Sequence, residues 1–145
     1  KWENALVINN LIASSYRLKE WRIRNASVNS SKFKKKKKNE RAEYFLSQNS
    51  FAAIDAILDA HNQIVKKNPY YDFAAFAMDK GAAIQLLVVI DKIKEMQDEL
   101  KVLPKDDFTK ANKLFNSAKD LHNAYYVSLI EQLSITGKIL DADGD

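Results

Sequence analysis

The chain has 145 residues, of which 46% are apolar and 29% charged, so it is long enough for one globular domain and is neither a disordered charged tail nor a fibrous repeat. It contains no cysteine, which excludes disulfides, a thiolate zinc site and a cysteine nucleophile. Three glycines and two prolines are too few for the turns of a β-sandwich or barrel, which leaves a helical protein.

The first predicted helix runs from about residue 2 to residue 24. Small and apolar residues recur there at steps of three and four, which places them on one helix face: Ala5, Ile8, Leu11, Ile12, Ser15, Leu18 and Trp21. Residues 25–39 are rich in lysine, serine and asparagine, and Val28 and Phe33 are their only large apolar side chains. We interpret this segment as a mobile loop.

Two helices are predicted after the loop. A short one begins near Glu40, and a longer one covers about residues 51–67. Asn49 or Ser50 is expected to cap the longer helix, because a side-chain oxygen at this position accepts a hydrogen bond from the first turn. Pro69 ends it, since proline lacks the backbone donor and disfavours helical geometry in the residue before it.

The next predicted helix spans about residues 73–103 and is apolar on most sides up to Ile90, which predicts the most buried element of the fold. Gly81 within it is interpreted as a point of close approach for a neighbouring backbone. Asp106 or Asp107 is expected to cap the last helix, which should reach about residue 136 and end at Gly137.

Four helices with short connections predict an all-α fold, an elongated and mainly antiparallel four-helix bundle with a basic loop between its first two helices. The bundle is expected to cover residues 1–137, with the loop at 25–39, and residues 138–145 form an acidic tail. The longest nearly apolar run, residues 82–90, is much shorter than the roughly 20 residues that cross a membrane, so we expect no transmembrane segment and a soluble protein.

Positive charge is concentrated in one part of the chain. Residues 17–41 contain eleven basic and two acidic residues, whereas residues 42–145 contain 11 basic and 16 acidic ones. Five consecutive lysines repel one another, and the local sequence offers few carboxylates to neutralise them. The predicted anion- or partner-binding residues are Arg17, Lys19, Arg22, Arg24, Lys32, Phe33, Lys34, Lys35, Lys36, Lys37, Lys38 and Arg41.

Such a segment indicates contact with an anionic surface or an acidic protein partner. Anionic lipid and nucleic acid both attract clustered lysines, and Phe33 is suited to insertion at a lipid interface or to stacking on a base. The expected function is therefore that of a non-enzymatic interaction or scaffold protein. A nucleic-acid-binding accessory protein is one alternative, and a loop that only solubilises the protein is the simplest one.

The two histidines, His61 and His122, both fall on apolar helix faces. Two imidazoles in one bundle core are candidate ligands for a metal or haem, so a ligand- or cofactor-binding bundle is a further alternative. However, the Glu-x-x-His pattern of di-iron bundles is absent, because Leu58 and Lys119 occupy the required positions. We expect buried histidines that hydrogen-bond to residues such as Tyr16, Tyr125, Asn9 or Asn62, with neither metal nor cofactor.

No catalytic motif is present. The sequence has no glycine-rich phosphate loop, serine elbow or zinc-type histidine motif, so we predict no enzymatic activity and no catalytic residue. Acidic residues on the helices, such as Asp91 and Asp98, are spaced to pair with lysines on solvated faces. Aromatic residues occur on more than one side of the helices, among them Trp2, Trp21, Tyr70 and Tyr71, and would also suit contact with a second copy of the chain or another subunit. The sequence does not indicate a cellular compartment.

Overall fold

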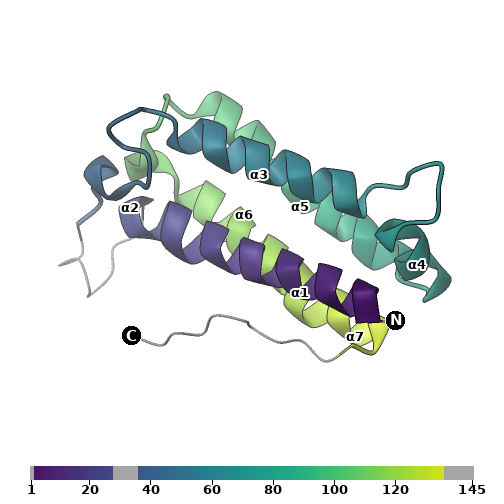
Figure 1. The fold of residues 1–145 in the computed structure, drawn as a ribbon. Helices are drawn as coiled ribbons and strands as arrows, with labels where there is room; N and C mark the ends of the chain where they lie inside the picture. The colour runs from purple at the N-terminus through teal and green to yellow at the C-terminus, as the bar shows by residue number, and fades with distance from the viewer. Residues whose placement is uncertain (1, 28–35, 136–145) are drawn as a thin grey trace.

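The computed structural model describes residues 2–27 and 36–135, and the described residues form an all-α bundle. This confirms the predicted fold class (Figure 1). Besides α-helices, the chain has π-helical and 3-10 segments, labelled η. The elements are α1 (Trp2–Arg17), η1 (Leu18–Arg24), α2 (Asn25–Ser27), η3 (Asn39–Arg41), α3 (Ser50–Val65), α4 (Phe73–Asp79), α5 (Ala83–Val102), η4 (Phe108–Lys110), α6 (Asn112–Asn123), η5 (Ala124–Leu129) and α7 (Ile130–Leu133).

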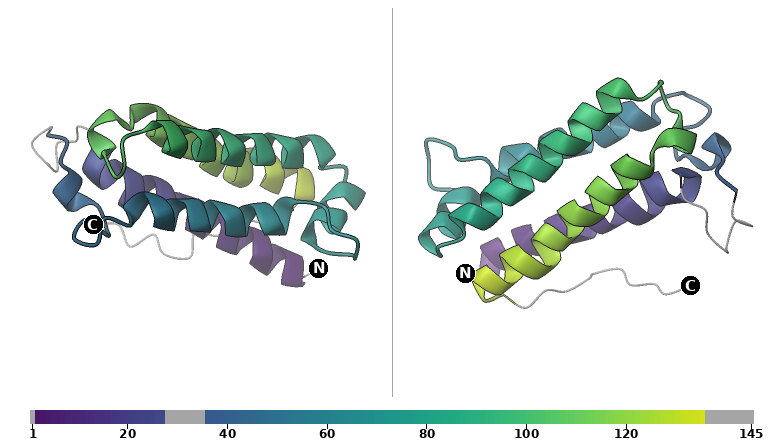
Figure 2. Two further views of the ribbon diagram at one scale, coloured as in Figure 1. Left: turned by 90° about the horizontal axis from the view of Figure 1, so that it is seen from above. Right: turned by 180° about the vertical axis from the view of Figure 1, so that it is seen from behind.

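Four long rods make up the bundle. They are α1 with η1 and α2, then α3, then α5, and finally α6 with η5 and α7. The α5 helix packs against α3 on one side and α6 on the other, and α6 packs against η1 and α1 (Figures 1 and 2). Contacts between α1 and α3 are sparser, so the seam between these two helices is the most open side of the bundle.

The first rod is longer than predicted and changes its winding midway. Ile8, Leu11 and Ile12 are buried at the predicted spacing. Beyond Leu18 the helix is π-helical, and the next fully buried residue is Ile23, five positions further along. Trp21, which was predicted to continue the apolar face of the first helix, is 51% exposed, so that face ends before it.

The amino terminus of α3 is capped from elsewhere in the chain. Asn49 precedes the helix but makes no side-chain capping hydrogen bond, contrary to the prediction. Instead, the carboxylate of Asp106 accepts hydrogen bonds from the backbone N–H groups of Ser50 (3.1 Å) and Phe51 (2.8 Å). Asp106 is buried, so the connection between α5 and η4 is held against the start of α3.

The long helix predicted between residues 73 and 103 is in fact two helices. The α4 helix ends at Asp79, and Gly81, two residues later, has a φ of +78° in the left-handed region that favours glycine. The N–H of Ala82 then donates to the carbonyl of Ala77 at 2.9 Å, which closes the turn. The role of Gly81 is therefore to end a helix.

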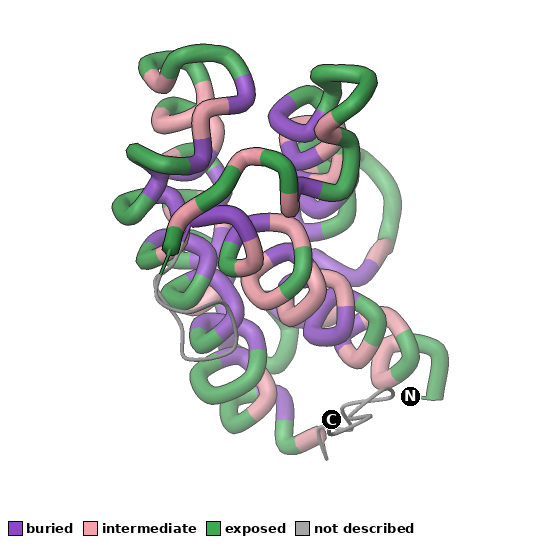
Figure 3. The backbone as a smooth tube through the Cα atoms, turned by 90° about the vertical axis from the view of Figure 1, so that its left-hand side faces the viewer, coloured by how far each residue is buried: buried purple, intermediate pink, exposed green. Residues whose placement is uncertain are grey.

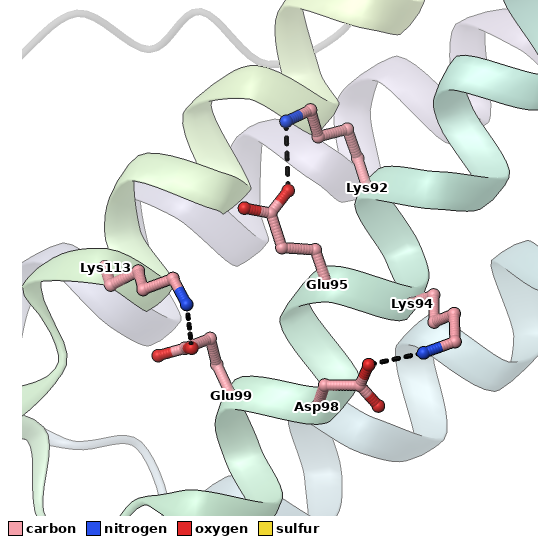
Figure 4. A network of polar contacts seen from close by, with 6 residues as sticks. All are labelled: Lys92, Lys94, Glu95, Asp98, Glu99 and Lys113. Carbon is pink, nitrogen blue, oxygen red and sulfur yellow. Dashed lines mark hydrogen bonds and ion pairs between the residues drawn. The ribbon is translucent and has the colours of Figure 1, made fainter.

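The α5 helix is less buried than its composition predicts. Leu86, Val89, Ile93 and Met96 face the core, but the first half of the helix also exposes three apolar side chains, Ile84, Leu87 and Val88. With neighbours on only two sides, α5 cannot bury apolar residues all around its axis. Its second half carries ion pairs on the outer surface, Lys92 with Glu95 and Lys94 with Asp98 on α5 itself and Lys113 of α6 with Glu99 (Figure 4).

The last rod starts later and ends earlier than predicted. Asp107 caps the short η4 segment by accepting the N–H of Thr109, and α6 begins at Asn112. The rod ends at α7, where Ser134 adopts a left-handed φ of +51°. Gly137, the predicted end, lies outside the described residues, as do the acidic tail 138–145 and residues 28–35 of the predicted loop. At the loop's beginning, Asn25–Ser27 are helical, so the loop does not start at residue 25.

One continuous apolar core joins the four rods. Buried residues line the inward faces along the whole bundle, as Figure 3 shows. At the end near the loop, the rings of Phe51 and Phe108 meet edge to face with centroids 4.8 Å apart. None of the helices within residues 2–27 and 36–135 is long and apolar enough to cross a membrane.

Candidate functional site

The cations predicted to bind an anion lie at one end of the bundle. Four of these cations lie at the end of α1 and in η1, namely Arg17, Lys19, Arg22 and Arg24. Four more lie on residues 36–43, which we call the returning chain, namely Lys36, Lys37, Lys38 and Arg41. We refer to these eight residues as the basic end. Lys32, Phe33, Lys34 and Lys35 lie outside the described residues. The returning chain is joined to the first rod by a hydrogen bond from the N–H of Lys38 to the carbonyl of Ala26 (3.1 Å).

Glu20 neutralises part of this charge. Its carboxylate accepts a hydrogen bond from Arg24 at 2.6 Å and lies 3.1 Å from the ammonium group of Lys19. Burial opposes ionisation of Glu20, but these two cations outweigh it and hold the pKa of the carboxyl below its ordinary value. Glu20 therefore stays ionised, with one carboxylate shared between two basic residues.

Arg22 pairs with a carboxylate from outside the basic segment. Its Nε lies 3.0 Å from Oε2 of Glu43, although the angle is unsuitable for a hydrogen bond. Among the described residues, the two terminal nitrogens of the same guanidinium have no hydrogen-bond partner. The side chain is partly buried, at 23% exposure, and the ion pair with Glu43 is its interaction with a charged group.

Lys37 and Arg41 bind oxygens of uncharged groups. The ammonium group of Lys37 donates to the carbonyl of Thr109 (3.1 Å) and to the side-chain oxygen of Asn112 (3.0 Å). Arg41 donates to the carbonyls of Lys36 (2.7 Å) and Asn25 (3.3 Å). These bonds fasten residues 36–41 to the bundle through neutral oxygen acceptors.

The basic end as a whole therefore keeps an excess of positive charge. Residues 17–24 and 36–43 contain eight basic residues and three acidic ones. Next to this surface is a hollow of about 490 Å³ lined by Trp21, Arg22, Asn25, Arg41 and Glu43. The exposed ring of Trp21 forms one side, and the guanidinium carbon of Arg17 lies 5.8 Å from the centre of that ring.

The histidines form a second set of polar contacts, inside the bundle. His61 of α3 is 3% exposed; its Nδ1 lies 3.0 Å from the hydroxyl of Tyr125, and its Nε2 lies 2.8 Å from Oγ of Ser14. Because the Tyr125 hydroxyl is completely buried, we assign it as the donor to Nδ1, which leaves the ring proton on Nε2. His61 then donates to Ser14. Burial lowers the pKa of His61 to about 4, so the ring is neutral at pH 7.

His122 of α6 contacts Ser15, the residue that follows Ser14 in the first rod. Its Nδ1 lies 2.9 Å from Oγ of Ser15, and this hydroxyl donates to the carbonyl of Ile12 at 2.9 Å. Tyr126 stacks on the imidazole, and Tyr16 meets it edge to face. Burial, followed by the charge of Lys19, lowers the pKa of His122 to about 4.

A groove runs along the open seam between α1 and α3. It has a volume of about 360 Å³, and Ser14 and His61 contribute polar groups to a mainly apolar lining that includes Leu11 and Ile57. Within residues 2–27 and 36–135, no group of three or more His, Cys, Asp or Glu residues is arranged to hold a metal ion.

The partners of the histidines were only partly foreseen. The hydrogen bond to Tyr125 was expected, and Tyr16 meets His122 through a ring contact and not through the expected hydrogen bond, whereas Ser14, Ser15 and Tyr126 were not expected. The signal available in the sequence is a pair of serines within the apolar stripe of the first helix. Two adjacent helix positions point about 100° apart, so each serine can reach a histidine on a different neighbouring helix.

Residues 2–135 match the family model described as Peptidase_M75, Imelysin. No curated protein and no solved structure matches the chain.

Proposed function

This chain belongs to the imelysin family, and we propose that it acts by binding, with its basic end in contact with an anionic partner. The observation that carries this proposal is the excess of basic over acidic residues at the basic end. Residues 17–24 and 36–43 contain eight basic residues and three acidic ones, and Glu20 and Glu43 are already paired with Lys19, Arg24 and Arg22. An external anion that supplied the missing negative charge would be attracted over a Debye length of about 8 Å at physiological salt.

The family carries the name of a peptidase, and the contact between Ser14 and His61 is the part of this chain that most resembles hydrolytic machinery. A catalytic base must accept the serine proton. With Tyr125 donating to Nδ1, the other nitrogen of His61 donates to Ser14 and cannot accept from it. A ring with a pKa of about 4 is also a weak base at neutral pH. We therefore propose that this pair is structural and that the chain is not itself an enzyme.

The proposal is tested by replacing lysines 34–38 with glutamine and measuring binding to three probes by fluorescence anisotropy or co-sedimentation. The probes are a glutamate-rich peptide, a single-stranded RNA oligomer and vesicles containing phosphatidylserine. We expect the substituted protein to bind the preferred probe at least about tenfold more weakly, because several charge contacts are lost together.

The matched control removes the same number of charges from exposed lysines elsewhere on the chain, at Lys66, Lys67, Lys80, Lys105 and Lys119. This control should retain more than half of the wild-type affinity, since the net charge changes equally but the basic end is intact. Equal weakening in both variants, or no binding of any probe by the wild type, would show that the basic end has no specific role.

A second candidate function is carriage of a small apolar ligand, and the groove between α1 and α3 favours it. A volume of about 360 Å³ falls in the range of small-molecule sites, and apolar walls with a few polar groups are typical of them. Ser14 and His61 are among the polar residues of this lining. Absorption spectra and elemental analysis of purified protein, followed by titration with haem, test this function. A colourless, metal-free protein that takes up no haem would leave binding at the basic end as the only proposal.

A further inference from the structure

We propose that the hollow beside Trp21 is a binding site for a carboxylate side chain of an acidic peptide segment, with Arg22 as its main donor. This inference rests on the proposed function, because it names the partner and the contact point for the same basic end.

Arg22 has the geometry to bind a second carboxylate. Glu43 approaches the guanidinium from the Nε side at 3.0 Å. The buried Nε makes no hydrogen bond, and the two terminal nitrogens, which form a separate edge of the planar group, make none to the described residues. Two parallel N–H groups match the two oxygens of a carboxylate, and such bidentate pairs are among the strongest hydrogen bonds that proteins make.

The hollow also offers apolar contact next to the charge. Trp21 lines the hollow and is 51% exposed. Trp, Tyr and Arg are the residues most enriched where protein interfaces concentrate their binding energy. The ring of Trp21 is already held on one face by Arg17, so little conformational entropy is lost when a partner covers its exposed part.

The distribution of charge favours a peptide over a continuous polyanion. Glu20 and Glu43 lie among the cations of this surface. A continuous row of phosphates or a bilayer surface would bring negative charge against both carboxylates, and like charges in contact repel. The carboxylate proposed at Arg22 also comes near Glu43, but it meets the terminal edge of the guanidinium and not the Nε side that Glu43 approaches. A peptide carries its negative charges on separate side chains. It can place one at Arg22 and others near Lys36 and Lys38, which are exposed on the returning chain.

The test measures binding of a fluorescein-labelled 12-residue peptide of glutamates with two phenylalanines, beside its glutamine counterpart. The proteins are the wild type, Arg22→Met, Arg22→Lys and Trp21→Ala. Arg24→Met is the matched control, because it removes the same charge two residues away from a side chain that pairs with Glu20 and does not line the hollow. Circular dichroism and thermal unfolding show whether each variant is folded.

We expect Arg22→Met and Trp21→Ala to weaken peptide binding about tenfold or more, and Arg24→Met to weaken it less than about threefold. Arg22→Lys keeps the charge but loses the planar donor pair, so it should resemble Arg22→Met if the fork is what binds. Equal effects at Arg22 and Arg24 would overturn the assigned site. If the wild-type protein binds the RNA oligomer or anionic vesicles but not the peptide, the acidic peptide is not the partner and the proposed function still stands. If it binds none of the three probes, both the acidic peptide as partner and the proposed function are overturned.

Discussion

Acidification from pH 7 to pH 5 should destabilise the fold through its two buried histidines. In the folded protein the pKa of both His61 and His122 is about 4, against 6.5 for an unperturbed histidine. Between these values the unfolded chain binds more protons than the folded one, so stability is complete above about pH 6.5 and is lost as the pH falls toward 4. The predicted loss between pH 7 and pH 5 is about 1.8 kcal/mol for each histidine and about 3.5 kcal/mol for the pair.

Urea denaturation followed by circular dichroism at pH 5, 6 and 7, at constant ionic strength, measures this loss. Carboxyl groups contribute little in this window, because they titrate mainly below pH 5 in an unfolded chain. The variant His61→Gln should lose roughly half of the pH dependence whatever its own stability, since the second histidine remains. A free energy of unfolding that stays constant within about 0.5 kcal/mol from pH 7 to pH 5 would refute the reasoning. A measured pKa near 6.5 for either ring would do the same for that residue.

Three further substitutions test the fold by thermal or urea unfolding. Asp106→Ala should cost about 2 kcal/mol, because the N–H groups of Ser50 and Phe51 lose their acceptor at a buried helix start, and a cost below about 0.5 kcal/mol would contradict the capping role. Gly81→Ala should cost about 1 kcal/mol, because its φ of +78° strains any residue with a Cβ, and an unchanged stability would argue against this conformation. Leu58→Ala should cost about 3 kcal/mol by leaving a cavity at a completely buried position, whereas a cost near that of a surface substitution would mean that α3 packs differently.

The fold class was predictable because apolar periodicity and scarce turn residues both indicate helices. The spacing of Ile8, Leu11 and Ile12 predicts the buried face of α1 correctly. The exposure of Trp21 was not predictable, since it depends on a π-helical segment whose winding departs from 3.6 residues per turn.

Features that depend on distant residues were missed for a common reason. The cap of α3 comes from Asp106, which is more than 50 residues away in sequence, and local patterns cannot reveal such a partner. The same holds for the contact of Arg22 with Glu43, whose position follows from how the returning chain lies against η1. The break at Gly81 had a local signal, but a strongly apolar run on both sides favoured one continuous helix.

Charge in the candidate site was predictable, whereas its neutralisation was not. Composition alone places the excess of positive charge in residues 17–41. Only the fold shows that Glu20 serves two cations and that Lys37 binds a carbonyl and an amide oxygen. Both facts determine how much charge is left for a partner.

The salt dependence of binding tests the central claim most directly. The dissociation constant of the wild-type protein for its preferred anionic probe is measured at several salt concentrations, beside the variant in which lysines 34–38 are glutamine. If the basic end binds through its unmatched charge, wild-type affinity falls about tenfold or more between 50 and 200 mM salt, and the variant shows a clearly shallower slope. Equal slopes for the two proteins, or an affinity that salt does not change, would contradict the account.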